Sequence, residues 1–149
     1  MKKLESFTEN LTRRHKGTEN MEMNENKIGT IIVNTAIYLH RKLGPGLLEN
    51  VYEIILMKLL SKKGLYVQRQ VPIPIKFEGE EFNEGFRIDL FVQGKVIIEL
   101  KSVEKITDVH KKQLLTYLKL TDTKVGYILN FKTEVMKAGI SRVINGKVE

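Results

Sequence analysis

Two apolar stretches of the chain contain charged side chains that could act together. Asp89 lies inside FRIDLFV (86–92), and Glu99 and Lys101 end the stretch KVIIELK (95–101). Charged side chains are rarely buried unless they are paired or bound to a metal ion. This set of two carboxylates and one ammonium is therefore the first candidate for chemistry.

The alternation of side chains along strands indicates whether the three groups meet. Successive side chains of a strand point to opposite faces of the sheet. If the apolar residues of the two stretches face each other, Asp89 comes beside Glu99, with Lys101 one step further along. This register requires an odd number of loop residues, which Gln93-Gly94 and one flanking residue would supply.

Two adjacent carboxylates repel each other unless one is protonated or a cation lies between them. Carboxylate and carbonyl oxygens are the ligands that Mg²⁺ or Mn²⁺ prefers, so Asp89 and Glu99 predict a metal site. The ammonium of Lys101 could orient an attacking water and stabilise negative charge on a phosphoryl group. The alternative is a plain ion pair at the end of a hairpin, emerging into solvent.

Helical spacing of apolar residues predicts two helices before these strands. The first covers 28–39, in a domain that begins near Asn24, and stops at KLGPG (42–46). The second runs over about 47–63 and ends at Gly64. Its expected inward residues are Val51, Ile54, Ile55, Leu59 and Leu60.

The remaining elements follow from a change of period after the second helix. Residues 66–77 alternate but contain Pro72 and Pro74, which indicates an edge or irregular strand. An amphipathic helix is predicted over 107–121 and a last strand over 125–131, followed by a short tail unit ending in ISRVI. The order is ααβββαβ, which makes the class α/β with a mixed sheet.

Length and composition set wider limits. The 149 residues suit one domain, expected over 24–149 after a mobile N-terminal tail over 1–23. The absence of cysteine excludes disulfides and thiolate metal sites, and no apolar run is long enough to span a membrane, so we expect a cytoplasmic protein. The net charge of +7 suits a polyanionic partner without identifying one.

Asp89 followed by Glu99-Leu100-Lys101 resembles the D…(D/E)-x-K signature of the PD-(D/E)XK nuclease superfamily. The stretch GLLENVY (46–52) resembles the motif that names the GxxExxY protein family, a branch of that superfamily. The resemblance covers about 27–143 and also includes RKLGPG, FRIDLFV, VIIELKSVEK, HKKQLLTYLKL and VGYILNF.

This resemblance implies a restriction-endonuclease-like core with a mixed four-stranded sheet flanked by helices. It also implies hydrolysis of nucleic-acid phosphodiester bonds with Mg²⁺ or Mn²⁺. The resemblance does not identify the substrate, and we expect DNA rather than RNA. Glu49 would add a carboxylate to those of Asp89 and Glu99 as a metal ligand. However, a carboxylate in the first turn of a helix is also favoured by the helix dipole alone. Tyr52 could hydrogen-bond Glu49 or belong to the core.

Further candidates could bind or support a substrate. His110, Gln113 and Tyr117 form one polar stripe on the later helix, and Gln113 with Tyr117 resembles the Q-x-x-x-Y motif of the exonuclease-like branch. The alternative is a solvated helix face. Arg87 could contact phosphate groups.

A second function class is a nucleic-acid-binding or protein-interaction module that has the same fold without turnover. The intact set of Asp89, Glu99 and Lys101 favours the enzyme, because a module without catalysis has no chemical need for it. A homodimer is compatible with the sequence, since nucleases that cut both strands often require one.

Overall fold

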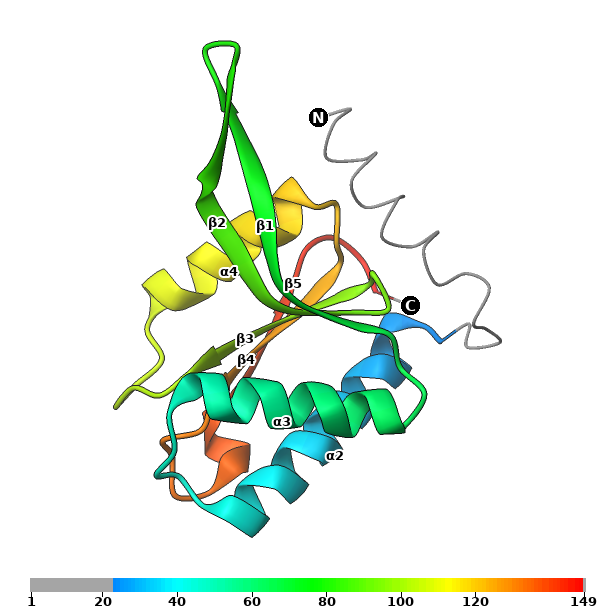
Figure 1. Ribbon diagram of the computed structural model, residues 1–149, viewed down its shortest axis with the longest axis vertical. Coiled ribbons are helices and arrows are strands. Elements are labelled where there is room, and N and C mark those ends of the chain that lie inside the picture. The colour runs from blue at the N-terminus through cyan, green and yellow to red at the C-terminus, as the bar shows by residue number, and fades with distance from the viewer. Residues whose placement is uncertain (1–22, 149) are drawn as a thin grey trace.

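A mixed β-sheet with helices on both faces forms the centre of the structure (Figure 1). The computed structural model describes residues 23–148, so the expected N-terminal tail lies outside the described residues except for Met23. The elements are α2 (Glu25–Leu43), α3 (Glu49–Lys62), β1 (Val67–Phe77), β2 (Glu80–Val92), β3 (Val96–Lys101), α4 (Asp108–Leu120), β4 (Val125–Asn130), the 3₁₀ helix η2 (Met136–Gly139) and β5 (Ile140–Ile144).

The strands lie in the order β1-β2-β3-β4-β5, and only β3 and β4 run parallel within the described sheet. The α/β class, the mixed sheet and the predicted element order are confirmed. The expectation of four strands is wrong, because β5 pairs antiparallel with β4 and adds a fifth strand. This strand is short and only partly buried, so its sequence shows little of the alternation that marks a strand.

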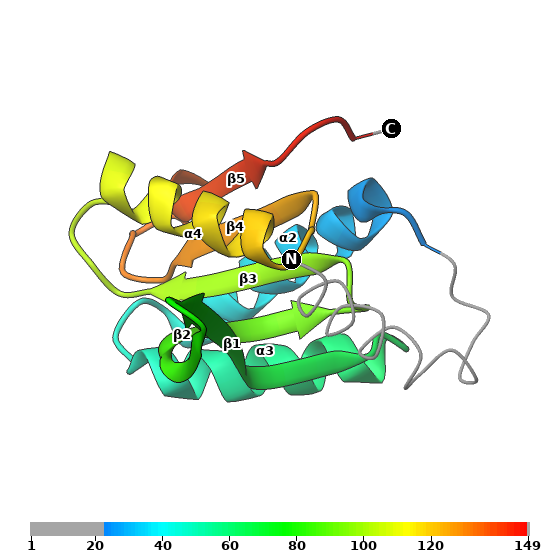
Figure 2. The same cartoon turned by 90° about the horizontal axis from the view of Figure 1, so that it is seen from above.

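Two layers of apolar side chains hold the helices to the sheet. Helices α2 and α3 cover one face and α4 covers the other (Figure 2). The strand β3 and the end of β2 contribute to both layers, so most of their residues are buried whichever face they point to. The hairpin of Asp89 and Glu99 therefore lies in the middle of the protein and is not a surface feature.

The first helix extends beyond the predicted 28–39 at both ends and stops within KLGPG, as predicted. The side chain of Asn24 accepts a hydrogen bond from the Lys27 N–H at 2.8 Å and caps α2. At the other end Gly44 adopts a φ of 73°, and its N–H donates to His40 at 2.7 Å.

The buried face of α3 differs from the one predicted. The fully buried residues of this helix are Tyr52, Glu53, Leu56 and Leu60, and of the predicted inward residues only Leu60 is among them. This helix is apolar on most sides, so spacing alone does not select one face. The burial of Glu53 was also not predicted, and this residue lies at the candidate site.

The strand β1 lies at one edge of the sheet, as its two prolines predict. It pairs with β2 over most of its length, and the far half of this two-stranded ribbon extends beyond the helices (Figure 1). The near half of the ribbon lies against α3 and brings Arg69 and Gln70 next to Asp89.

Candidate active site

The hairpin of β2 and β3 has the predicted register. Leu90 pairs with Ile98 and Val92 pairs with Val96, which sets Asp89 opposite Glu99. The loop between the strands has three residues (93–95), the odd number that this register requires.

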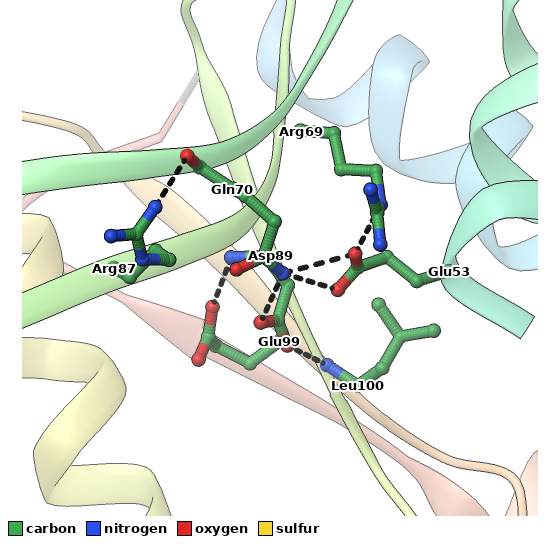
Figure 3. Close-up of polar contacts among 7 residues, drawn as sticks. All are labelled: Glu53, Arg69, Gln70, Arg87, Asp89, Glu99 and Leu100. Atoms are coloured by element: carbon green, nitrogen blue, oxygen red, sulfur yellow. Dashed lines mark hydrogen bonds and ion pairs between the residues drawn. The ribbon is translucent and has the colours of Figure 1, made fainter. Parts of the chain in front are cut away.

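The two carboxylates stand where the backbone pairing of β2 and β3 ends. The N–H of Asp89 donates to Oε2 of Glu99 at 2.9 Å, and the N–H of Leu100 donates to Oδ2 of Asp89 at 2.9 Å (Figure 3). Each strand thus binds the carboxylate of the other through a backbone N–H. These reciprocal bonds fix both side chains between the strands.

Burial disfavours the charged form of both acids. Burial and then the charge of Asp89 raise the pKa of Glu99, which is 6% exposed, to about 8. Burial, and then the nearby carboxylates of Glu53 and Glu49, raise the pKa of Asp89 to about 6, although the Leu100 N–H opposes this. Around neutral pH the pair therefore holds a proton unless a cation compensates its charge.

Lys101 extends from the same end of β3 as Glu99. Its positive charge lowers the pKa of both Asp89 and Glu99, so the ammonium favours the ionised form of these two carboxylates. The residue next to it on β4 is Asn130, which is 1% exposed. The Asn130 side chain accepts from the Val103 N–H at 3.1 Å and donates to the Val103 carbonyl at 2.8 Å. Asn130, which the sequence did not single out, therefore holds the loop that follows Lys101.

A second group of polar side chains, also not anticipated, lies beside Asp89. Glu53 of α3 is 4% exposed and pairs with the Arg69 Nε at 2.5 Å. The Gln70 amide donates to both oxygens of Glu53, at 2.9 and 3.0 Å, and approaches Oδ1 of Asp89 at 3.5 Å (Figure 3). The only signal in the sequence is an acidic residue one turn after Glu49 on the same helix.

Tyr117 is the residue of the α4 stripe that reaches the site. Burial, and then the charges of Glu99 and Asp89, raise the pKa of its hydroxyl to about 12. Its ring lies edge-on to Phe86 at 4.9 Å between centroids. Gln113, one turn earlier, is exposed and makes no side-chain hydrogen bond within the described residues.

Tyr52 does not bind Glu49. Its hydroxyl donates to the Gly44 carbonyl and accepts from the Leu47 N–H at 3.1 Å, and its ring stacks on Phe131 at 4.3 Å. Tyr52 thus ties the loop between α2 and α3 to the core. Glu49 begins α3 as an exposed residue and influences Asp89 through its charge.

His110 and Arg87 have local partners. The Nδ1 atom of His110 accepts a hydrogen bond from the Thr107 N–H at 2.9 Å, so the imidazole caps the start of α4. Arg87 is exposed and donates to the Gln70 carbonyl at 3.4 Å (Figure 3). This bond places Arg87 at the border of the site, on the strand that carries Asp89.

A divalent cation such as Mg²⁺ needs several oxygen ligands around it. Residues 23–148 contain no group of three His, Cys, Asp or Glu side chains placed to hold one metal ion. The predicted set of Glu49, Asp89 and Glu99 is therefore not assembled in this structure. Mg²⁺ commonly binds one or two carboxylates and completes its coordination with water and substrate phosphates. Asp89 and Glu99 fit that requirement, because a cation would offset their repulsion.

Comparison with protein-family models identifies the superfamily of the chain. The model of the PD-(D/E)XK nuclease superfamily matches residues 26–143, a span that includes the whole site. Neither the curated proteins nor the solved structures yielded a match. No helix among the described residues has the length and apolar character needed to cross a bilayer. The GxxExxY branch stays a prediction. The chain belongs to the PD-(D/E)XK nuclease superfamily.

Proposed function

We propose that the protein is a metal-dependent nuclease that hydrolyses phosphodiester bonds of nucleic acid, with DNA as its substrate. The observation that carries this proposal is the reciprocal binding of Asp89 and Glu99 by backbone N–H groups, with Lys101 acting on both. Membership of a superfamily whose members are generally nucleases supports the same reaction.

The acidic residues would bind the cation. Asp89 and Glu99 would hold Mg²⁺ or Mn²⁺ directly, and the exposed Glu49 would add negative charge from the start of α3. When bound, such a cation supplies Lewis-acid stabilisation of the charge that develops on the phosphoryl oxygens. The two N–H donors keep the carboxylates in place, so little reorganisation is needed when the substrate arrives.

The other side chains would act on water and substrate. Lys101 would orient the attacking water and donate to a non-bridging phosphoryl oxygen. Tyr117, with its pKa raised to about 12 by burial and by the two carboxylates, keeps its proton at neutral pH and can donate a hydrogen bond. Arg87 and Gln113 are exposed and would contact the nucleic-acid backbone, which the net charge of +7 also favours.

A cleavage assay with a matched pair of lysine variants tests the proposal. Single- and double-stranded DNA and RNA are incubated with Mg²⁺, Mn²⁺ or EDTA and with wild type, Lys101→Ala or Lys105→Ala. Lys105 is an exposed lysine in the loop after β3 and serves as the control. We expect metal-dependent cleavage that Lys101→Ala reduces at least about 100-fold, as the loss of a single stabilising donor does in other hydrolases. Equal activity of the two variants, or no cleavage by wild type, would favour the non-catalytic module.

A further inference from the structure

Gln70 has a backbone conformation that glutamine rarely adopts. Its φ is 55°, in the left-handed region, although it lies within the strand β1. The pairs on either side, Arg69 with Leu90 and Val71 with Ile88, place Gln70 opposite Asp89. Strained residues of this kind persist where the surrounding structure enforces them, often at functional sites.

This conformation lets two consecutive side chains reach one carboxylate. In a regular strand Arg69 and Gln70 would point to opposite faces of the sheet. Here the Arg69 Nε contacts Glu53 at 2.5 Å, and the Gln70 amide contacts both Glu53 oxygens at 2.9 and 3.0 Å. The left-handed turn of the backbone at Gln70 thus places both residues on the buried Glu53.

Glu53 in turn determines how the Gln70 amide is oriented. An ionised carboxylate only accepts hydrogen bonds, so it must face the NH₂ group of the amide and not its oxygen. The same Nε2 atom lies 3.5 Å from Oδ1 of Asp89, while the Leu100 N–H holds Oδ2 at 2.9 Å. Asp89 is therefore approached by a donor at each of its two oxygens.

A role confined to neutralising Glu53 does not explain Gln70. The charge of Glu53 already has its partner in Arg69, and a neutral amide adds no charge. The Gln70 amide instead connects this ion pair to Asp89, and the Gln70 carbonyl accepts a bond from Arg87 at 3.4 Å that supports the strained backbone (Figure 3).

We propose that Gln70 is a positioning residue, locked by Glu53 and Arg69, that orients the Asp89 carboxylate for its cation; this inference rests on the proposed nuclease function. Residues that support metal ligands in this way commonly change metal affinity or activity about 10- to 100-fold when they are replaced. Through the contacts Arg69–Glu53–Gln70–Asp89, α3 and the edge strand β1 then help to hold the Asp89 carboxylate in place.

The experiment compares two glutamine variants with the same backbone strain. Gln70→Asn retains an amide and tolerates the left-handed region, but its side chain is too short to bridge Glu53 and Asp89. The control is Gln93→Asn, because Gln93 also has a left-handed φ, of 56°, and binds the Tyr66 N–H at 2.6 Å in the hairpin loop. Both proteins are measured for kcat and KM on the cleaved nucleic acid, for Mn²⁺ affinity by calorimetry, and for melting temperature.

We expect Gln70→Asn to lower kcat about 10- to 100-fold with KM little changed, and to weaken Mn²⁺ binding. Gln93→Asn should change the melting temperature and leave kcat and Mn²⁺ affinity near those of wild type. Glu53→Gln should reproduce the defect of Gln70→Asn, and the double variant should be no worse than either, because the residues act as one unit.

Several outcomes separate this inference from the proposed function. If wild type cleaves and Gln70→Asn matches it in kcat and Mn²⁺ affinity, the positioning role is wrong and the nuclease stands. If wild type binds Mn²⁺ but cleaves no nucleic acid, the nuclease proposal fails. Mn²⁺ affinity then decides the positioning role, which weaker binding by Gln70→Asn supports and equal binding overturns. Absence of Mn²⁺ binding by wild type overturns both.

Discussion

The backbone N–H of Asp89 donates to the carboxylate of Glu99 at 2.9 Å, on the strand opposite. The oxygen of a neutral amide of the same shape can also accept that bond. Substitution by Asn or Gln therefore removes charge from the site while it retains the acceptor that each strand offers to the other. The effect of the charge can therefore be measured separately from the effect of the hydrogen bonds.

Asp89→Asn and Glu99→Gln should leave the metal-free protein as stable as wild type or slightly more stable. The reason is that burial and the Asp89 charge oppose ionisation of Glu99, as the raised pKa of about 8 indicates. The same changes should abolish stabilisation by Mg²⁺, since a ligand stabilises only the state that binds it. Thermal melts in EDTA and in Mg²⁺ measure both effects.

A structural ion pair with Lys101 predicts the opposite outcome for these variants. Removal of one carboxylate would leave the ammonium without its partner and destabilise the fold with or without metal. Lower melting temperatures of both variants in EDTA, together with a wild type that does not respond to Mg²⁺, would exclude the metal site.

The stability of the metal-free protein should fall as pH rises from about 4 to about 8. The pKa of Asp89 rises from 3.8 to about 6 and that of Glu99 from 4.5 to about 8 on folding, mainly through burial. The folded state thus binds protons more tightly, and this contribution is complete below the unfolded pKa values and lost as pH passes the folded ones. Urea denaturation across this range measures the slope.

Two controls accompany the pH series. Saturating Mg²⁺ should flatten the slope, because the cation competes with protons for the same oxygens. The double variant Asp89→Asn/Glu99→Gln should flatten it without metal. A double variant with the pH profile of wild type would show that other groups are responsible.

Tyr52→Phe should destabilise the protein by about 1–3 kcal/mol, because the Gly44 carbonyl and the Leu47 N–H lose their buried partner. The stacking on Phe131 is retained, so the loss reports on the hydroxyl. Tyr38→Phe is the matched control, since Tyr38 is 45% exposed. Chemical denaturation measures the difference. A fall in kcat with unchanged stability would instead assign Tyr52 to the reaction.

His110→Ala should reduce stability by about 0.5–1.5 kcal/mol, because the Thr107 N–H at the start of α4 loses its acceptor. The rate of cleavage should stay close to that of wild type, since the imidazole is engaged in the cap. Melting curves and kcat are measured on the same preparation. A tenfold loss of kcat would show that His110 takes part in the chemistry.

The position of Asp89 beside Glu99 could be predicted from the sequence, because it depends on residues that are close together in the chain. Alternation along β2 and β3 and the length of their loop determine that Asp89 lies beside Glu99, and the register confirms it. Both signals lie within 16 consecutive residues, 86–101, so no knowledge of distant packing was needed. The two prolines likewise predicted that β1 lies at an edge.

The parts that depend on packing between distant elements could not be predicted. Glu53 of α3 lies at the site through its contacts with Arg69 and Gln70 of β1. The sequence does not show which face of this helix packs against that strand. The sequence gives no sign of the left-handed backbone at Gln70 either, because glycine or asparagine usually occupies such positions. Asn130 is similar, since its role follows from the loop that passes over it.

The prolines of β1 also limit how the protein can associate with itself. Open edges of sheets present rows of N–H and C=O groups that recruit strands from other chains and lead to aggregates. Pro72 and Pro74 carry no N–H, so the outer side of β1 lacks these donors where a second chain would align. Continuous sheet growth across two copies is therefore disfavoured on this side.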